Sequence, residues 1–259
     1  MRINRRKFLK ITGVATLGLI AKSKLDTLSK LDLIEALPEE KKALEAEQWG
    51  MAIDVGKCGD ECRDCIEACH KVHNVPAFDN PKDEISWLRT IGFEEAFPEQ
   101  AHEFTRKSLA HKPVLVLCNH CRNPQCVKVC PTQATWLRED GIVMMDMHRC
   151  IGCRYCMAAC PYGARSFNWR DPRPSIKEID PEFPTRGKGV VEKCNFCAER
   201  LAVGKIPACV EACKEGALIF GDLEDPNSEV RKALGSSYST VRKPSLGTKP
   251  KVYYIIRGE

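Results

Sequence analysis

Sixteen cysteines in a chain of 259 residues fall into four blocks of four, and this spacing constrains the chain more than any other feature. The third block reads CIGCRYCMAACP, which is a C-x2-C-x2-C-x3-C-P run. In such a run three thiolates surround one 4Fe–4S cluster from a tight loop, and the fourth, on the next helical turn, points towards a second cluster. At four thiolates per cluster, the sequence predicts four 4Fe–4S clusters. The blocks are Cys58, Cys62, Cys65 and Cys69; Cys118, Cys121, Cys126 and Cys130; Cys150, Cys153, Cys156 and Cys160; and Cys194, Cys197, Cys209 and Cys213.

Disulfides and structural zinc are the two other uses of so many cysteines. Disulfide frameworks belong mainly to small domains with thin cores, and a chain of this length with 43% hydrophobic residues does not need eight of them. Zinc prefers paired C-x2-C knuckles, and the prolines that follow Cys130 and Cys160 have no role in such a knuckle. The fourth block has a looser C-x2-C-x11-C-x3-C spacing, so zinc stays most open there.

The N-terminal segment MRINRRKFLKITGVATLGLIA has the features of an export signal. Arg5 and Arg6 precede a mildly apolar run from Ile11 to Ala21, which is typical of a twin-arginine signal, and we assign residues 1–30 to a signal or anchor. A basic amphipathic helix is the alternative. Lys22 and Lys24 end the run before the roughly 20 apolar residues that a membrane span needs. The expected location is the outer face of the cytoplasmic membrane, reached by export of the folded protein.

The rest of the chain predicts a linker helix over 31–48 and an α+β domain over 49–259. Each cysteine block follows a short apolar run, and helix formers such as Ile66–Ala68 and Met157–Ala159 close the blocks, so that strand, ligand loop and short helix repeat. The predicted strands are Met51–Val55, Val114–Leu117, Ile142–Met145, Gly189–Val191, Ala217–Phe220 and Val252–Ile256. Lys71–Lys112 is predicted to be an insertion, and the proline-rich stretch Arg165–Lys193 an extended loop; long loops of this kind are usually functional surface.

Four ordered blocks, with CNHCRNPQCVKVCP as the second, resemble the iron–sulfur subunits of the dimethyl sulfoxide reductase and formate dehydrogenase family over roughly Trp49–Phe220. The first block, DVGKCGDECRDCIEACHKVHNVP, and the twin-arginine segment are most similar to the branch found in Hdr-like menaquinol oxidoreductase and sulfite-reduction-associated membrane complexes. The resemblance implies tandem bacterial-ferredoxin-like modules. The inner cluster pair would lie within 114–170, and the outer pair would be built from 51–75 and 189–220.

The same resemblance implies how the cysteines are shared, with the fourth cysteine of a block crossing to the neighbouring cluster. The four implied ligand sets are Cys58, Cys62, Cys65 and Cys213; Cys194, Cys197, Cys209 and Cys69; Cys118, Cys121, Cys126 and Cys160; and Cys150, Cys153, Cys156 and Cys130. The first block departs from the family, because three residues instead of two separate Cys58 from Cys62. We expect Gly59 to absorb the extra residue through a backbone conformation closed to other residues. A labile or three-iron cluster is the alternative.

The histidines are predicted to be secondary to the cysteines. His70 directly follows Cys69, but the C-x3-C-H spacing is wrong for haem attachment and both cysteines already have cluster roles. His120, between Cys118 and Cys121, is expected to tune or pack rather than ligate. The remaining histidines, including His73 and His111, are expected to be surface or packing residues.

These features predict an electron-transfer iron–sulfur subunit with no catalytic residues of its own. It would relay single electrons within a membrane-associated menaquinol-linked complex, between an integral-membrane quinone-reactive subunit and another redox subunit, for which a cytochrome is one candidate. The sequence holds no G-x-G-x-x-G, P-loop or G-x-S-x-G motif. The net charge of +5 is too mild and dispersed for a nucleic-acid partner. A stand-alone iron–sulfur reductase and a cluster scaffold or maturation protein are the alternatives. They would need an open iron or a cluster released on demand, and sixteen ligands for four clusters leave no iron unligated.

Overall fold

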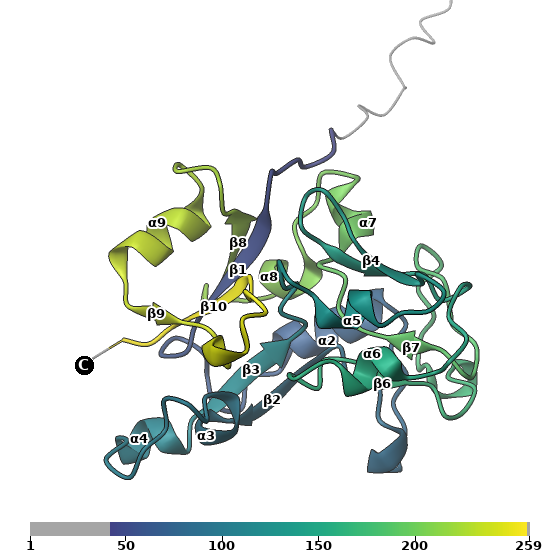
Figure 1. Ribbon diagram of the computed structural model, residues 1–259, viewed down its shortest axis with the longest axis horizontal. Coiled ribbons are helices and arrows are strands. Elements are labelled where there is room, and N and C mark those ends of the chain that lie inside the picture. The colour runs from purple at the N-terminus through teal and green to yellow at the C-terminus, as the bar shows by residue number, and fades with distance from the viewer. Residues whose placement is uncertain (1–41, 258–259) are drawn as a thin grey trace, which may run out of the picture. The chain divides into compact units, whose positions relative to one another are not determined.

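The computed structural model describes residues 42–257, which lie in the second of the two units into which the chain divides at Lys41 (Figure 1). Both the predicted export signal and most of the predicted linker fall outside the described residues. Within 42–257 helices and strands are mixed, as predicted. No helix in this range is long and apolar enough to cross a membrane.

The largest sheet brings together strands from the two ends of the described chain. Its order is β8 (Leu218–Asp222), β1 (Trp49–Asp54), β10 (Val252–Ile255) and β9 (Ser239–Thr240). Strand β1 is antiparallel to β8 and parallel to β10, so that Met51 lies opposite both Phe220 and Val252. All residues of β1 are buried, as expected of a central strand covered on both faces. Three of the predicted strands are thereby confirmed.

Alternate residues of β1 face two different cores. Met51 and Ile53 pack in the large core, whereas Ala52 packs with Val230 and Leu223 in a small core beneath α9 (Glu229–Ser236). This follows from the two-residue period of a strand, which sends successive side chains to opposite faces. Helix α9 begins where the Ser228 hydroxyl accepts a hydrogen bond from the Arg231 N–H.

Three small antiparallel hairpins carry the remaining strands. They pair β2 (Leu88–Gly92) with β3 (Pro113–Leu117), β4 (Thr135–Leu137) with β5 (Val143–Met145), and β6 (Ser166–Phe167) with β7 (Val191–Glu192). Strands β3 and β5 confirm the predicted runs before blocks two and three, whereas β7 overlaps the predicted run Gly189–Val191 only at Val191. The predicted insertion Lys71–Lys112 contributes β2, which gives β3 its partner, so this stretch is part of the core.

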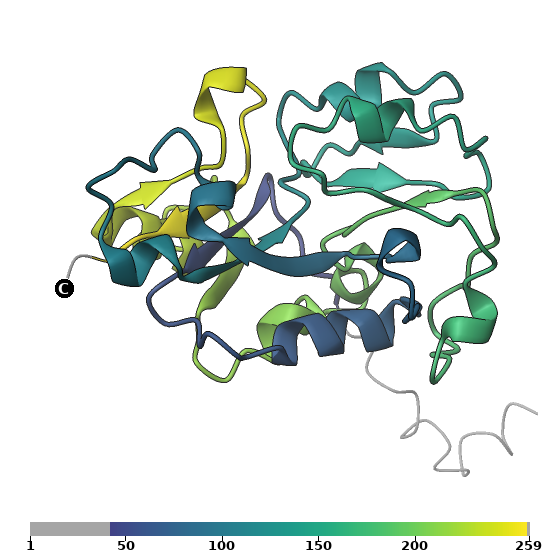
Figure 2. The same cartoon turned by 90° about the horizontal axis from the view of Figure 1, so that it is seen from below.

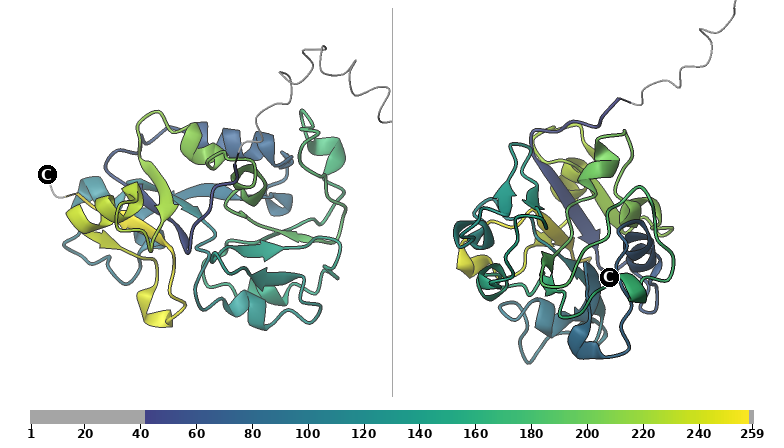
Figure 3. Two further views of the ribbon diagram at one scale, coloured as in Figure 1. Left: turned by 90° about the horizontal axis from the view of Figure 1, so that it is seen from above. Right: turned by 90° about the vertical axis from the view of Figure 1, so that its right-hand side faces the viewer.

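Six of the eight α-helices in the described residues are single turns, and four of these close a ligand loop. Helix α2 (Asp64–Val72) carries the end of the first block, and α8 (Ala208–Glu211) lies beside it (Figures 2 and 3). A helix of four residues is unstable alone, so packing must hold these turns in place. The other helices are α3 (Phe93–Ala96), α4 (Lys107–Ala110), α5 (Gln125–Lys128), α6 (Tyr155–Ala158) and α7 (Ala198–Leu201), with 3₁₀ turns at Pro81–Asp83, Arg173–Ser175 and Pro244–Leu246.

The described part of the predicted linker helix, residues 42–48, is not helical. Its backbone is held by tertiary partners instead. The Leu44 N–H donates to the Leu201 carbonyl, and the N–H groups of Glu47 and Gln48 donate to the Asp222 carboxylate at 2.8 and 3.0 Å. Tertiary hydrogen bonds have therefore outweighed the helix propensity of the Glu- and Ala-rich sequence.

Candidate iron–sulfur centres

All sixteen cysteines lie in the described range, and all are free thiols. The structure brings them together in four groups of four, each drawn from two blocks of the sequence. In two of the groups, the four cysteines line one cavity. In the other two, the negative charges of the thiolates raise the pKa of a cysteine in the same group. Each group has the donor set that a 4Fe–4S cluster requires.

The first group joins the beginning of block one to the end of block four. Burial and the negative charges of neighbouring thiolates raise the pKa of Cys65 to about 12. Those neighbours are Cys58, Cys213 and Cys62. Cys213 reaches this place because α8, just before it, packs beside α2. Cys62 is exposed to solvent, so this group opens at the molecular surface.

The second group contains the last cysteine of block one and three from block four. Burial raises the pKa of Cys69 well above its usual value, and nearby thiolates raise it further. The nearest of these are Cys194, Cys209 and Cys197. All four members of the group are buried. Two receive backbone hydrogen bonds at sulfur, from Phe196 N–H to Cys194 Sγ and from Ala208 N–H to Cys197 Sγ, both at 3.4 Å.

The third and fourth groups line two separate cavities. One cavity is bounded by Cys118, Cys121, Cys126 and Cys160, and the other by Cys130, Cys150, Cys153 and Cys156. Cys160 thus sits with block two and Cys130 with block three. Cys153 is exposed, so the fourth group also reaches the surface. Around Cys130, burial is outweighed by hydrogen bonds from Thr132, Ala134 and Thr135, which lower the pKa of its thiol and favour the thiolate.

Charge interactions between thiolates link neighbouring groups in one order. Cys65 of the first group lies near Cys69 and Cys209 of the second. After burial, the charge of Cys118 is the largest influence on the Cys194 pKa, so the second group adjoins the third. Cys126 in turn influences the pKa of Cys156, which joins the third group to the fourth. The thiolate charges therefore link the four groups in one order, from the first to the fourth, and each end group contains an exposed cysteine.

Buried cations surround the inner groups. The Lys193 ammonium donates to the carbonyls of Val143 and Cys194, the latter at 2.7 Å, and it lies close to both Cys118 and Cys194. Burial lowers the pKa of Arg165, but the thiolates of Cys126 and Cys156 outweigh it and the net pKa is raised. Such charges offset the negative charge that thiolates and reduced clusters bring into a low-dielectric interior.

Unusual backbone conformations concentrate in the ligand loops. Among the non-glycine residues with positive φ, His120, Arg154, Phe196 and Cys197 lie inside cysteine blocks. Such conformations cost about 1 kcal/mol or more each and persist where packing holds them. Gly152 has φ +71°, and an added Cβ would lie 2.4 Å from the Gly189 carbonyl oxygen, so this position requires glycine.

The first block accommodates its extra residue without the expected glycine conformation. Gly59 is not among the glycines with positive φ, and an added Cβ would lie 3.5 Å from Cys62 Cβ, an ordinary contact. The loop is organised instead by the fully buried Asp54, whose carboxylate accepts hydrogen bonds from the N–H groups of Gly56 and Lys57. A side chain before the block, rather than a special backbone angle inside it, sets the turn.

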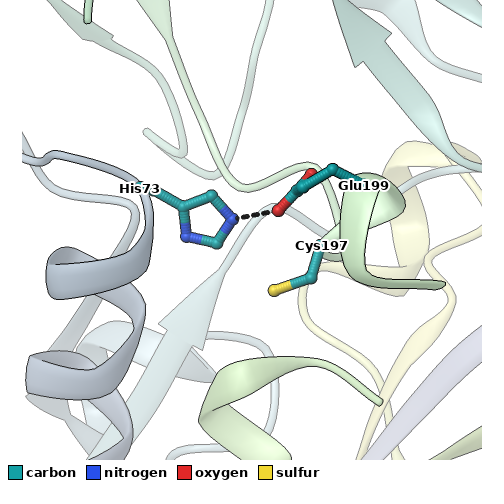
Figure 4. Close-up of side chains that lie close together, drawn as sticks. All are labelled: His73, Cys197 and Glu199. Atoms are coloured by element: carbon teal, nitrogen blue, oxygen red, sulfur yellow. Dashed lines mark hydrogen bonds and ion pairs between the residues drawn. The ribbon is translucent and has the colours of Figure 1, made fainter. Parts of the chain in front are cut away.

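His73 is a site residue that the sequence did not reveal, since it was expected to be a surface or packing residue. It is buried at the end of α2, and its Nε2 lies 2.8 Å from Glu199 Oε1 (Figure 4). Burial alone would lower the pKa of His73, but the nearby Cys197 thiol and Glu199 carboxylate outweigh it and raise the pKa to about 9. Its neighbour His70 has a buried Nε2 with no partner among the described residues. Cys65 and Cys69 belong to different groups, which does not suit a haem attached through both.

Comparison with known proteins identifies the chain's family. The family model of the 4Fe–4S dicluster domain matches residues 113–174 and 181–223. The Hdr-like menaquinol oxidoreductase iron–sulfur subunit 1 of Archaeoglobus fulgidus is 44% identical over 279 aligned positions, which cover 99% of each chain. The chain belongs to this family of iron–sulfur subunits. It therefore binds 4Fe–4S clusters and is an electron-transfer subunit, as the sequence predicts.

Two further relatives of this iron–sulfur subunit come from other reductases. The menaquinone reductase iron–sulfur cluster-binding subunit of Nitratidesulfovibrio vulgaris is 37% identical over 82% of this chain and 90% of the relative. A tetrathionate reductase subunit of Salmonella typhimurium is 36% identical over 98% of this chain and 89% of the relative. Their names differ in substrate and agree in the role of a subunit, so the shared element is the cluster-binding chain.

Proposed function

We propose that this chain is a four-cluster electron wire. Each of the four cysteine groups described above would be the ligand set of one cluster. In every block, the fourth cysteine would ligate the neighbouring cluster. The observation that carries this proposal is the pair of cavities in which Cys160 joins block two and Cys130 joins block three. When bound, each cluster accepts and releases one electron; the chain's own residues hold, insulate and tune it.

The position of the groups supports relay rather than substrate chemistry. The end groups contain the exposed residues Cys62 and Cys153, whereas the second group is fully buried. Electrons can therefore enter and leave at the two ends, while the second group is shielded from solvent. A stand-alone reductase or a cluster scaffold needs an open iron or a releasable cluster, and four filled ligand sets leave neither.

We further propose that the chain works in a membrane-associated complex that exchanges electrons with the menaquinol–menaquinone couple. The relatives from Archaeoglobus fulgidus and Nitratidesulfovibrio vulgaris are named for menaquinol or menaquinone. The twin arginines Arg5 and Arg6 support export of the folded, cluster-loaded chain to the outer face of the membrane. Its partners would be an integral-membrane quinone-reactive subunit and a second redox subunit.

The crossed ligand sets are tested with paired substitutions. Cys121→Ala with Cys160→Ala removes two ligands from one proposed centre, whereas Cys153→Ala with Cys160→Ala removes one ligand from each of two. The anaerobically purified chain should contain about sixteen irons, read with acid-labile sulfide and EPR of the reduced protein. The first variant should lose one centre and the second should disturb two. Uncrossed ligation predicts the reverse result.

The role in the complex is tested with a menaquinol analogue. The analogue should reduce the clusters when it is added to the intact complex and fail to reduce the isolated chain. If the isolated chain reduced a small substrate with its own turnover, the subunit role would be wrong.

A further inference from the structure

His73 lies at the second group of cysteines with every polar atom of its ring engaged. Its Nδ1 lies 2.8 Å from the Cys69 carbonyl oxygen and 3.5 Å from Cys69 Sγ. Its Nε2 faces Glu199 at 2.8 Å (Figure 4). Cys197 Sγ belongs to the same small cluster, in which one ligand atom of each residue lies within 4.8 Å of the others.

The partners decide the direction of these hydrogen bonds. A carbonyl oxygen and an ionised carboxylate only accept, so both ring nitrogens of His73 must donate. The Nδ1–H group is shared between the carbonyl oxygen and the sulfur of Cys69, and the positive ring faces that sulfur. His73, Cys197 and Glu199 could in principle hold a separate metal ion. That use would take Cys197 from its cysteine group and the proton from the ring nitrogen that faces Glu199, so the donor arrangement is preferred.

The surrounding residues prevent the ring from turning away. Trp87 stacks on it with 4.4 Å between centroids, and Phe183 meets it edge-on at 4.8 Å. The Arg186 guanidinium donates to the His73 carbonyl. These three residues come from Lys71–Lys112 and Arg165–Lys193, the two stretches between cysteine blocks. Both stretches therefore contribute to a rigid enclosure around His73.

Glu199 is fixed as firmly as the ring. The Asn195 side-chain amide donates to Glu199 Oε2 at 2.8 Å, and its oxygen accepts from the Cys197 N–H at 2.8 Å. Asn195 thus ties the carboxylate to the ligand loop of block four. The chain of contacts from Asn195 through Glu199 and His73 therefore connects Cys197 to Cys69 within the second group.

We propose that His73 is a positioning residue that acts through Cys69 and raises the reduction potential of the cluster held by Cys69, Cys194, Cys197 and Cys209. The inference rests on the proposed ligand sets. A donor and a positive charge beside a ligand sulfur stabilise the electron added on reduction, and hydrogen bonds to sulfur are a main determinant of cluster potential. The effect is strong in this group because water is excluded from it.

The test is an EPR-monitored redox titration of the intact complex with His73→Phe, which keeps a ring against Trp87 and removes both donors. The second centre is first identified as the one whose signal is altered by Cys69→Ala and also by Cys209→Ala. In His73→Phe its reduction should become at least tenfold less favourable, which is a fall of about 59 mV for a one-electron couple. The three other potentials should stay unchanged, as should all four in the control His111→Phe, an exposed histidine.

A second variant keeps the test decisive if His73→Phe does not accumulate. His73→Phe with Glu199→Gln removes the carboxylate that the single change leaves unpaired, and a smaller fall in the same potential is expected. An unchanged potential of a fully loaded second centre in either variant would overturn the inference, as would an equal shift of all four centres. If Cys69→Ala and Cys209→Ala alter different centres, the proposed ligand sets themselves are wrong, whatever His73 does.

Discussion

Cys194 and Cys118, far apart in the sequence, lie near each other where the second cysteine group meets the third. Each belongs to a different pair of blocks, and the charge of Cys118 acts on the Cys194 pKa more strongly than that of any other residue. This contact is the junction between the outer and inner halves of the proposed wire. Lys193 supplies a buried positive charge at the same place.

Lys193→Met should weaken this junction. Two carbonyl groups lose a buried donor, and we expect a loss of about 1–3 kcal/mol in the free energy of unfolding. Loss of the charge should also lower the potentials of the second and third centres together. Denaturant unfolding and a redox titration measure the two effects. Lys188→Met, at an exposed lysine, should change neither; equal effects in both variants would show that the position of Lys193 is unimportant.

Arg186→Met should be among the most destabilising single changes in the domain. Arg186 and Glu192 form an ion pair in which both side chains are almost completely buried, and Glu192 also accepts from Trp87 Nε1 at 2.9 Å. Removing one member of a buried pair leaves an unpaired charge and costs about 3–5 kcal/mol. Urea unfolding measures the loss. The matched change Lys232→Met breaks the exposed pair with Glu229 and should have little effect.

Gly152→Ala should cost the protein one cluster. The residue has positive φ, and the new methyl group would overlap the Gly189 carbonyl, so the loop bearing Cys150 and Cys153 must move. Iron analysis should show a loss of about four irons per chain. Gly187→Ala is the control, because nothing lies within 4 Å of its added Cβ. Retention of all iron in Gly152→Ala would contradict this account of the loop.

Asp222→Asn should release the segment that leads to the N-terminus. Burial alone would raise the pKa of Asp222, but backbone N–H groups of Glu224, Glu47 and Gln48 outweigh it and lower the pKa. At pH values above the ordinary pKa of an aspartate, the carboxylate therefore stabilises the fold. This contribution is lost as the pH falls through the lowered pKa of Asp222.

Because Asp222 is partly exposed, we expect a loss of roughly 1 kcal/mol at about pH 7. Hydrogen exchange at Glu47 and Gln48 should be faster in Asp222→Asn than in the wild type at neutral pH, after correction for intrinsic exchange. The difference should shrink at acid pH. Equal protection at neutral pH would rule out the carboxylate as the anchor.

The cofactor class, the family and most of the strands could be predicted from the order of the amino acids. Ligand number and spacing are chemical requirements, so CIGCRYCMAACP indicates a cluster loop without any knowledge of the fold. The buried runs before the cysteine blocks likewise predicted β1, β3 and β5, because a short apolar run must be covered wherever it folds.

The surroundings of the cysteines, in contrast, emerged only from the folded chain. His73 looks like any helical histidine in the sequence, and its role depends on Trp87, Phe183 and Glu199, which come from three other segments. The placement of Asp54 in the first loop and of Lys193 between two groups has the same origin. The burial, charge and hydrogen-bond direction at a site depend on several segments that are distant in the sequence. No local sequence pattern therefore contains this information.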